Sequence, residues 1–106
     1  MTANDLTQFI ILFLNERGWD VWRNNSGVVK TGSYAIHLSP AFSGDIIGSD
    51  PDGRYVHIEV KVDNDILSKG QIDTLYKIAK SRYGITCVAR TKEQFLKWFH
   101  NCKKFN

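Results

Sequence analysis

Hydrophobic residues recur at helical spacing in three segments of the chain. The first segment, residues 5–17, is followed by Gly18, and the second runs over residues 68–82. The third, residues 91–102, opens with TKEQ, which has the form of a capping box. Apolar positions three or four residues apart predict an amphipathic helix in each segment. These positions are Leu6, Phe9, Ile10, Phe13 and Leu14; Ile72, Leu75, Tyr76 and Ala79; and Phe95, Leu96, Trp98, Phe99 and Cys102.

Between the helical segments the pattern changes to short apolar runs and to alternation with a period of two, which is typical of strands. Residues 28–43 give a mixed signal, in which residues 34–38 have the composition of a strand that Pro40 closes. The order helix, three strands, helix, strand, helix predicts an α/β fold in which a mixed sheet is flanked by helices. The three strands before the second helix are expected at residues 20–23, 45–48 and 55–62, and the last strand at residues 85–89, so the segment 34–38 is not counted in this order.

The composition is that of a soluble globular protein, with 42% hydrophobic and 24% charged residues in a chain of 106. It predicts one domain over residues 1–106 and excludes a disordered chain, a fibre or a membrane protein. The apolar run FIILFL is too short to span a bilayer, and Asn4 and Asp5 do not make the basic flank of a signal peptide. We therefore expect a cytoplasmic protein without a membrane partner. Cys87 and Cys102 lack the close Cys/His spacing of a zinc site, so we expect reduced packing residues.

Charge is divided unevenly along the chain. Residues 1–65 carry five Lys and Arg against nine Asp and Glu, whereas residues 66–106 carry nine against two. A cation site beside a basic surface suits a polyanionic partner, because Lys and Arg displace the counterions of a phosphate backbone. The alternative is an ordinary solvated surface.

The expected hairpin, residues 44–62, has the sequence GDIIGSDPDGRYVHIEVKV. Its period of two puts Glu59 and Lys61 on one face, opposite the face of the valines and the isoleucine. With the turn centred near Asp52, antiparallel pairing matches residues whose numbers sum to about 104, which places Asp45 opposite Glu59. The hairpin is therefore expected to bring two carboxylates together with an ammonium group beside them.

Two carboxylates in contact repel each other unless a cation neutralises them, and Mg²⁺ and Mn²⁺ prefer oxygen ligands. Such a cation lowers the pKa of a bound water and takes up charge on a phosphoryl oxygen, while Lys61 orients the water or stabilises the transition state. This is the chemistry of phosphodiester hydrolysis. The alternative is an ordinary hairpin on which Lys61 forms a surface ion pair with Glu59, the commoner explanation of a Glu-x-Lys pattern taken alone.

Asp45, the hairpin turn and Glu59-Val60-Lys61 resemble the motif of the PD-(D/E)xK nucleases, and more narrowly the chain is similar to the stand-alone VRR-NUC family. Gly44 stands where that motif often has proline. The similarity covers roughly residues 19–89. It is carried by VWRNNSG at 21–27, GDIIGSDPDGR at 44–54, IEVK at 58–61 and LSKGQ at 67–71, in the order that the family shows.

The resemblance implies a restriction-endonuclease-like fold and a Mg²⁺- or Mn²⁺-dependent endonuclease, often dimeric. It also implies a relation to Holliday-junction resolvases and other structure-specific nucleases of phage and repair systems. In such nucleases a first-helix glutamate often joins the metal site. Glu16 is the candidate, and a helix-end salt bridge is its alternative. Gln71 matches the family's glutamine after the lysine strand, and it also completes a Ser68-x-x-Gln71 capping box, so both roles can hold.

A 12.1 kDa monomer offers little surface for holding a DNA junction. We therefore expect a homodimer, the commonest oligomer. The apolar band of the third helix is interpreted as core first and as a dimer interface second, with the contact expected around Phe95, Trp98 and Phe99 on the part left over after one side of the helix has packed on the sheet. His57 shares the face of Glu59 one pleat away and is interpreted as a neighbour of the site. Five basic residues are candidate nucleic-acid contacts, although each taken alone is more often solvated surface. They are Arg23, Lys69, Lys77, Lys80 and Arg90.

The leading hypothesis is a metal-dependent DNA endonuclease acting on branched DNA such as a Holliday junction. Asp45 and Glu59 are its metal ligands, and Val60 lends its backbone carbonyl. One alternative is a nucleic-acid-binding module that keeps the fold without cutting, and another is an RNA-cutting or restriction-like nuclease. A decayed site would usually have lost a carboxylate or the lysine. Because Asp45, Glu59 and Lys61 are all present, the sequence favours cleavage.

Overall fold

The computed structural model describes residues 1–24, 28–31, 34–37 and 44–102. Within these residues the three predicted helices form, and each begins directly after a capping residue: Thr2, Ser68 or Thr91. The elements, in chain order, are α1 (Ala3–Asn15), β1 (Asp20–Arg23), β2 (Val28–Thr31), β3 (Tyr34–His37), β4 (Ile46–Ser49), β5 (Tyr55–Val60), α2 (Lys69–Lys80), β6 (Gly84–Ala89) and α3 (Lys92–Asn101).

Four strands form one mixed sheet in the order β1-β4-β5-β6. The β1–β4 and β4–β5 pairs are antiparallel, whereas β5 and β6 are parallel and are connected through α2. The predicted α/β class and mixed sheet are thus confirmed. The predicted element order differs from the structure, because β2 and β3 form a separate antiparallel pair between β1 and β4.

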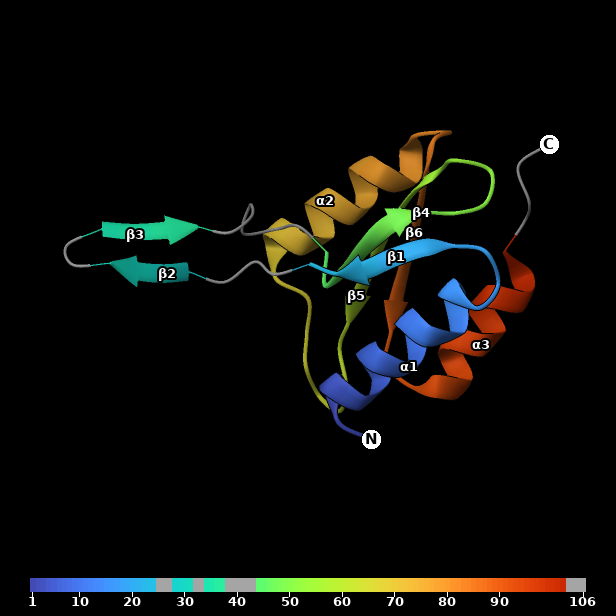
Figure 1. Cartoon of the computed structure of the whole chain (residues 1–106), viewed down its shortest axis with the longest axis horizontal. Coiled ribbons are helices and arrows are strands. Elements are labelled where there is room, and N and C mark those ends of the chain that lie inside the picture. The colour runs from blue at the N-terminus through green and yellow to red at the C-terminus, as the bar shows by residue number, and fades with distance from the viewer. Residues whose placement is uncertain (25–27, 32–33, 38–43, 103–106) are drawn as a thin grey trace.

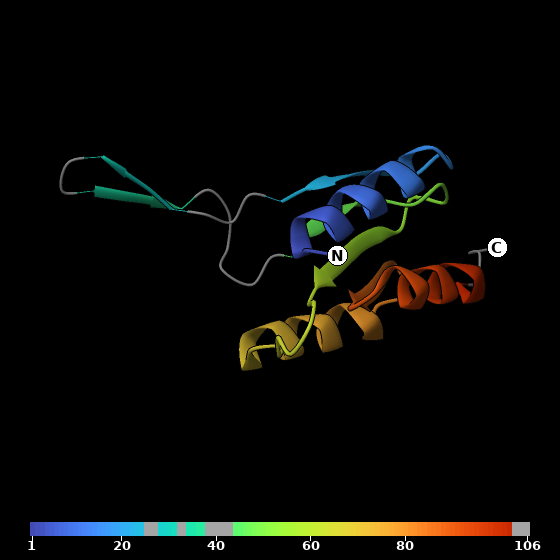
Figure 2. The ribbon, with the colours of Figure 1, turned by 90° about the horizontal axis from the view of Figure 1, so that it is seen from below.

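The β2–β3 hairpin extends away from the four-stranded sheet (Figures 1 and 2). The mixed signal of residues 28–43 predicted only the second of these strands. The sequence does not predict the first of them, Val28–Thr31. The expected closure of the second strand at Pro40 lies outside the described residues.

The sheet lies between α2 on one side and α1 with α3 on the other (Figure 1). On the α1 and α3 side, alternate residues of β5 point into the hydrophobic core, which includes Val56, Ile58 and Val60. The helices contribute Leu6, Ile10, Leu14 and Phe95 to the same core. The other residues of β5, among them His57 and Glu59, therefore face the α2 side of the sheet. None of the described helices is both long and apolar enough to cross a membrane.

The apolar face of α3 is packed inside the molecule, which confirms its interpretation as core and corrects the prediction that part of it is left over for a dimer. Phe95 is fully buried, and its ring lies edge-on to that of Phe13, with 5.5 Å between centroids. Phe99 contacts Phe13 in the same way at 4.9 Å, and Trp98 contacts Trp19 at 6.2 Å. These aromatic side chains join α3 to α1 and to the start of β1, a contact that helical periodicity alone does not distinguish from an exposed band.

The α2 helix packs less deeply than its apolar pattern indicated. Ile72 and Tyr76 are 50% and 64% exposed, and no residue of the helix is fully buried. Leu75 and Ile78 are half-buried instead. The reason is that α2 has its main contacts with β6, the edge strand of the sheet, so that only a narrow stripe of the helix is covered.

Candidate active site

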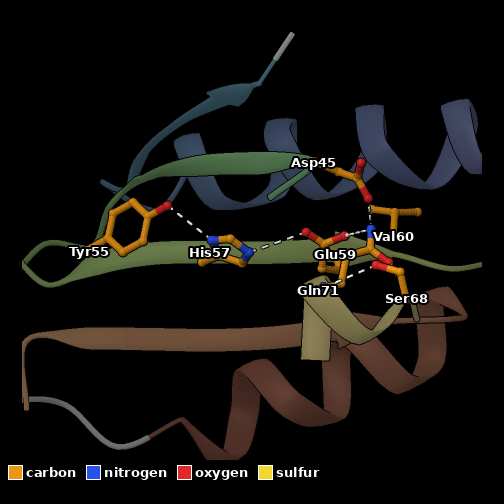
Figure 3. Close-up of polar contacts among 7 residues, drawn as sticks. All are labelled: Asp45, Tyr55, His57, Glu59, Val60, Ser68 and Gln71. Carbon is orange, nitrogen blue, oxygen red and sulfur yellow. Dashed lines mark hydrogen bonds and ion pairs between the residues drawn. The ribbon is translucent and has the colours of Figure 1, made fainter. Parts of the chain in front are cut away.

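The candidate site lies at the end of the sheet where β5 and β6 finish and α2 begins. Ile46 pairs with Ile58, so the next position along the hairpin sets Asp45 opposite Glu59. This is the register that the turn sequence predicted. The Asp45 carboxylate Oδ2 accepts a 2.8 Å hydrogen bond from the backbone N–H of Val60. Asp45 is thereby held at the end of β5, beside Glu59 (Figure 3).

Glu59 is a fully buried carboxylate. Its Oε2 accepts a 2.8 Å hydrogen bond from Gln71 Nε2. Its Oε1 lies 3.3 Å from His57 Nε2, but the two groups are poorly aligned, and both atoms lack a hydrogen-bond partner among the described residues. A buried anionic oxygen without a partner is costly unless a cation or a proton donor serves it.

Gln71 caps α2 as the sequence predicted, and it also contacts Glu59. Its Oε1 accepts a hydrogen bond from the backbone N–H of Ser68 at 2.9 Å, which completes the capping box of α2. Its Nε2 donates to Glu59. The same side chain therefore starts the helix and holds the buried carboxylate, which fixes the start of α2 against β5 (Figure 3).

His57 is closer to Glu59 than the sequence indicated. The imidazole is 1% exposed, and its Nδ1 lies 3.1 Å from the hydroxyl of Tyr55. Burial, and then the negative charge of Glu59, raise the pKa of Tyr55. In Figure 3 the three side chains form a row along β5. The signal in the sequence was the spacing Tyr-x-His-x-Glu, which puts three polar groups on one face of a strand.

Lys61 directly follows β5 and is half-buried. Its backbone N–H donates to Ala89 O at 2.9 Å, so the pairing with β6 continues for one residue past Val60. Its carbonyl accepts from Arg90 Nη1 at 3.4 Å, and the same guanidinium atom donates to Asp65 O at 2.7 Å. Arg90 thus binds the segment after β5 through two backbone carbonyl oxygens. The sequence predicted only a phosphate contact for this residue.

Glu16 is not brought to this site. It follows α1 as the C-cap residue, its side chain is 73% exposed, and it lies 3.9 Å from Arg17. The end of α1 that lies near Asp45 is the N-terminal one, because Arg23 Nη2 donates to Asn4 Oδ1 at 2.6 Å. Spacing along the helix placed Glu16 near the buried stripe but did not determine which end of the helix meets the site.

The other basic candidates are divided along α2. Lys69 is the first residue of the helix, near Gln71, whereas Lys77 and Lys80 belong to its last turn. A helix of 12 residues is about 18 Å long. Arg23, Lys69 and Arg90 are therefore at the end of the sheet that holds the two carboxylates, and Lys77 and Lys80 are well away from it. The Lys80 ammonium lies 4.5 Å from the ring centroid of Tyr76.

The carboxylates fit a hard divalent cation of the kind that the resemblance implies. Glu59 offers a buried oxygen without a hydrogen-bond partner, and Asp45 has one oxygen engaged by Val60. Within the described ranges no group of three or more His, Cys, Asp or Glu side chains is placed to hold a metal. Two carboxylates suit Mg²⁺, which usually keeps several waters and takes only one or two carboxylates plus substrate phosphate.

A cavity of about 560 Å³ lies elsewhere, at the turn between β4 and β5, with Trp19, Asp50 and Phe99 among its lining residues. Its lining includes neither Asp45 nor Glu59, so the cavity is separate from the candidate site.

Comparison of the chain with models of protein families gives no match, and comparison with curated proteins gives none either.

Proposed function

We propose that this protein is a Mg²⁺- or Mn²⁺-dependent endonuclease that hydrolyses phosphodiester bonds in DNA and belongs to the restriction-endonuclease-like nucleases, near the VRR-NUC family. The observation that carries the proposal is the buried Glu59 carboxylate, which has one oxygen without a hydrogen-bond partner among the described residues and is in register with Asp45. A buried acid of this kind, next to a second acid and followed by Lys61, is costly for stability and is best explained by the cation and substrate that it serves.

In this proposal each residue of the site has a definite task. Asp45 and Glu59 would hold the cation, with the Val60 carbonyl as a third oxygen. When bound, the cation supplies charge neutralisation at the phosphoryl oxygen and acidifies a water. The Lys61 ammonium orients the attacking water and stabilises the charge of the transition state. Gln71 keeps the Glu59 carboxylate in place, and Arg23 and Lys69 bind flanking phosphates.

Branched DNA, such as a Holliday junction, is the proposed substrate, and a homodimer is the proposed active form. The aromatic face of α3 is packed against α1, so a dimer would use another surface. Several large apolar side chains are exposed on the α2 side or close to it, including Ile72, Tyr76 and Tyr83. Sedimentation velocity at micromolar concentration measures the oligomeric state.

A non-cleaving binding module is the second candidate. The observation that favours it is that Asp45 and Glu59 each have a hydrogen bond within the protein, together with the lack of a three-residue metal cluster in the described part of the chain. Such a module would bind DNA equally well with the divalent cation or with EDTA.

A cleavage panel separates these candidates. The substrates are a four-way junction, a flap, single-stranded DNA, linear duplex DNA and RNA, each incubated with Mg²⁺, Mn²⁺ or EDTA. We expect cleavage of branched DNA with either cation and none with EDTA. Glu59→Gln serves as the matched inactive control, because it keeps the side-chain shape and removes the charge. Binding of every DNA without cleavage of any would favour the binding module instead.

A further inference from the structure

Polar atoms of the His57 and Glu59 side chains face each other on the α2 side of the sheet. Nε2 of His57 and Oε1 of Glu59 are 3.3 Å apart, and the side chains are 1% and 0% exposed. The packing around the histidine is as tight as its burial suggests. A Cβ atom built on Gly44 would lie 3.0 Å from Cδ2 and from Nε2 of the ring, closer than carbon atoms pack without displacement.

The close approach of Gly44 explains a departure from the motif that the sequence resembles. Gly44 stands where proline is often found, and any residue with a side chain at this position would push against the His57 ring. The imidazole therefore occupies the space next to Asp45 that a side chain at position 44 would need. Gly44 and the buried His57 therefore pack directly against each other beside Asp45 and Glu59.

The other side of the histidine is fixed by Tyr55. The hydroxyl of Tyr55 lies 3.1 Å from Nδ1 of His57, and this contact orients the imidazole ring. The other ring nitrogen, Nε2, then faces Oε1 of Glu59 at 3.3 Å. In Figure 3 Tyr55, His57 and Glu59 form a row along β5, with the His57 ring between the hydroxyl and the carboxylate.

We propose that His57 is a positioning residue for Glu59. Tyr55 holds the imidazole in place, and the absence of a side chain at Gly44 leaves room for the ring. Gln71 holds Oε2 of the carboxylate, and His57 faces Oε1. The carboxylate thus lies between Gln71 and His57. This arrangement belongs to the metal-free protein, and only its consequence for cation binding rests on the proposed function. Groups that orient a metal ligand typically change metal affinity about 10- to 100-fold when they are removed.

Crystal structures of the metal-free wild type and variants test the arrangement, and Mn²⁺ calorimetry tests its consequence. His57→Leu removes both ring nitrogens. His57→Gln restores an N–H near the position of Nε2. Val56→Ala is the matched control, because it weakens the same strand on its core face without touching Glu59. Tyr55→Phe removes only the hydroxyl and keeps the ring, so it remains informative if His57→Leu does not fold.

We expect the Glu59 carboxylate to leave its wild-type position in His57→Leu and to return to it in His57→Gln. Mn²⁺ affinity should fall about 10- to 100-fold in His57→Leu, recover in His57→Gln and be unchanged in Val56→Ala. Tyr55→Phe should turn the ring and lower the affinity by less. An unmoved Glu59 in both His57→Leu and Tyr55→Phe, or a displaced Glu59 in His57→Gln, would overturn the proposal. A wild type that binds no Mn²⁺ would contradict the proposed function, while the crystal structures would still decide the role of His57.

Discussion

Among single residues, the buried ionisable groups at the two ends of β5 have different purposes. At one end, one oxygen of the Glu59 carboxylate has no hydrogen-bond partner in the part of the chain that the structure describes. At the other end, in the turn that precedes β5, Asp50 is also buried, but both of its oxygens are engaged by backbone N–H groups or by Arg54. Fully satisfied buried charges stabilise a turn, whereas an incompletely satisfied one is typical of a functional site.

Asp50 is predicted to matter for stability and not for cleavage. Its Oδ2 lies 2.6 Å from Arg54 Nε, with side chains 1% and 14% exposed. Because Asp50→Ala would remove the carboxylate that faces a largely buried guanidinium, we expect a loss of about 3 kcal/mol in the free energy of unfolding. Urea denaturation measures it. Asp20→Ala, an exposed acid on β1, is the control and should change stability by less than about 0.5 kcal/mol. Equal midpoints for the two variants would contradict this role.

Cys87 predicts a dependence of stability on alkaline pH. Burial, and then the charge of Cys102, raise the pKa of Cys87 from 9.0 to about 12. The folded protein therefore keeps this thiol protonated where the unfolded chain loses the proton. The resulting stabilisation is complete below pH 9 and declines as pH rises toward 12. The decline is at most about 1.4 kcal/mol per pH unit.

Urea denaturation of the wild type and of Cys87→Ala between about pH 8 and about pH 10 isolates this contribution. The other groups with raised pKa, Tyr55 and Cys102, remain in both proteins. The stability difference between them should therefore become smaller as pH rises. A difference that stays constant over this range would show that Cys87 has an ordinary pKa in the folded protein.

At the scale of elements, α2 is connected to the site through its first turn. Ser68 Oγ accepts from the Gln71 backbone N–H at 3.1 Å, while the Gln71 side chain reaches both Ser68 and Glu59. The helix packs on the edge strand without a fully buried residue. Its position relative to β5 therefore depends strongly on these few polar contacts.

The two members of the capping box should separate helix stability from function. Ser68→Ala removes the cap and should lower the free energy of unfolding by about 1 kcal/mol while cleavage is retained. Gln71→Ala should cost a similar amount of stability and, in addition, reduce the cleavage rate, because Glu59 loses its donor. Thermal denaturation and single-turnover cleavage measure the two effects. Equal cleavage rates in both variants would show that Gln71 only caps the helix.

Elements with a clear period were predictable from the sequence. The alternation in YVHIEVKV and the turn before it determine the register of β4 and β5, because a slip by one residue would expose the whole core face. The exposed face of α2 was not predictable, since a period of 3.6 residues shows which positions lie together and not how much of the sheet they cover. The contact of His57 with Glu59 depends on side-chain rotamers and on the space above Gly44, and strand alternation determines neither.

At the scale of the whole molecule, five of the nine Lys and Arg residues in 66–106 belong to α2 and α3, which lie on opposite sides of the sheet (Figure 1). Only the α2 side also holds Glu59.

The wrong placement of Glu16 at the site also has its cause in the arrangement of the whole molecule. The sequence gives the helix and its buried stripe, but the direction in which the helix crosses the sheet is a tertiary property. Arg23 bonded to Asn4 shows that direction.

The lysines of α2 should bind the substrate, and those of α3 should not. In EDTA, Lys77→Ala and Lys80→Ala should each weaken binding of a four-way junction and reduce the slope of log affinity against log salt by about 0.9. Lys97→Ala, an exposed lysine on α3, is the matched control and should leave the slope unchanged. Fluorescence anisotropy measures both quantities. A slope that changes equally in all three variants would assign the charge effect to the overall field of the protein.

A calorimetric titration of Mn²⁺, in parallel with cleavage of the same preparations, tests whether the paired carboxylates of the hairpin form the centre of a metal-dependent nuclease. The wild type should bind Mn²⁺ and cut DNA. Asp45→Ala and Glu59→Ala should each abolish both while leaving the fold intact, and Lys61→Ala should bind Mn²⁺ like the wild type and lose the cleavage rate. Unchanged Mn²⁺ affinity in both carboxylate variants would contradict the assignment.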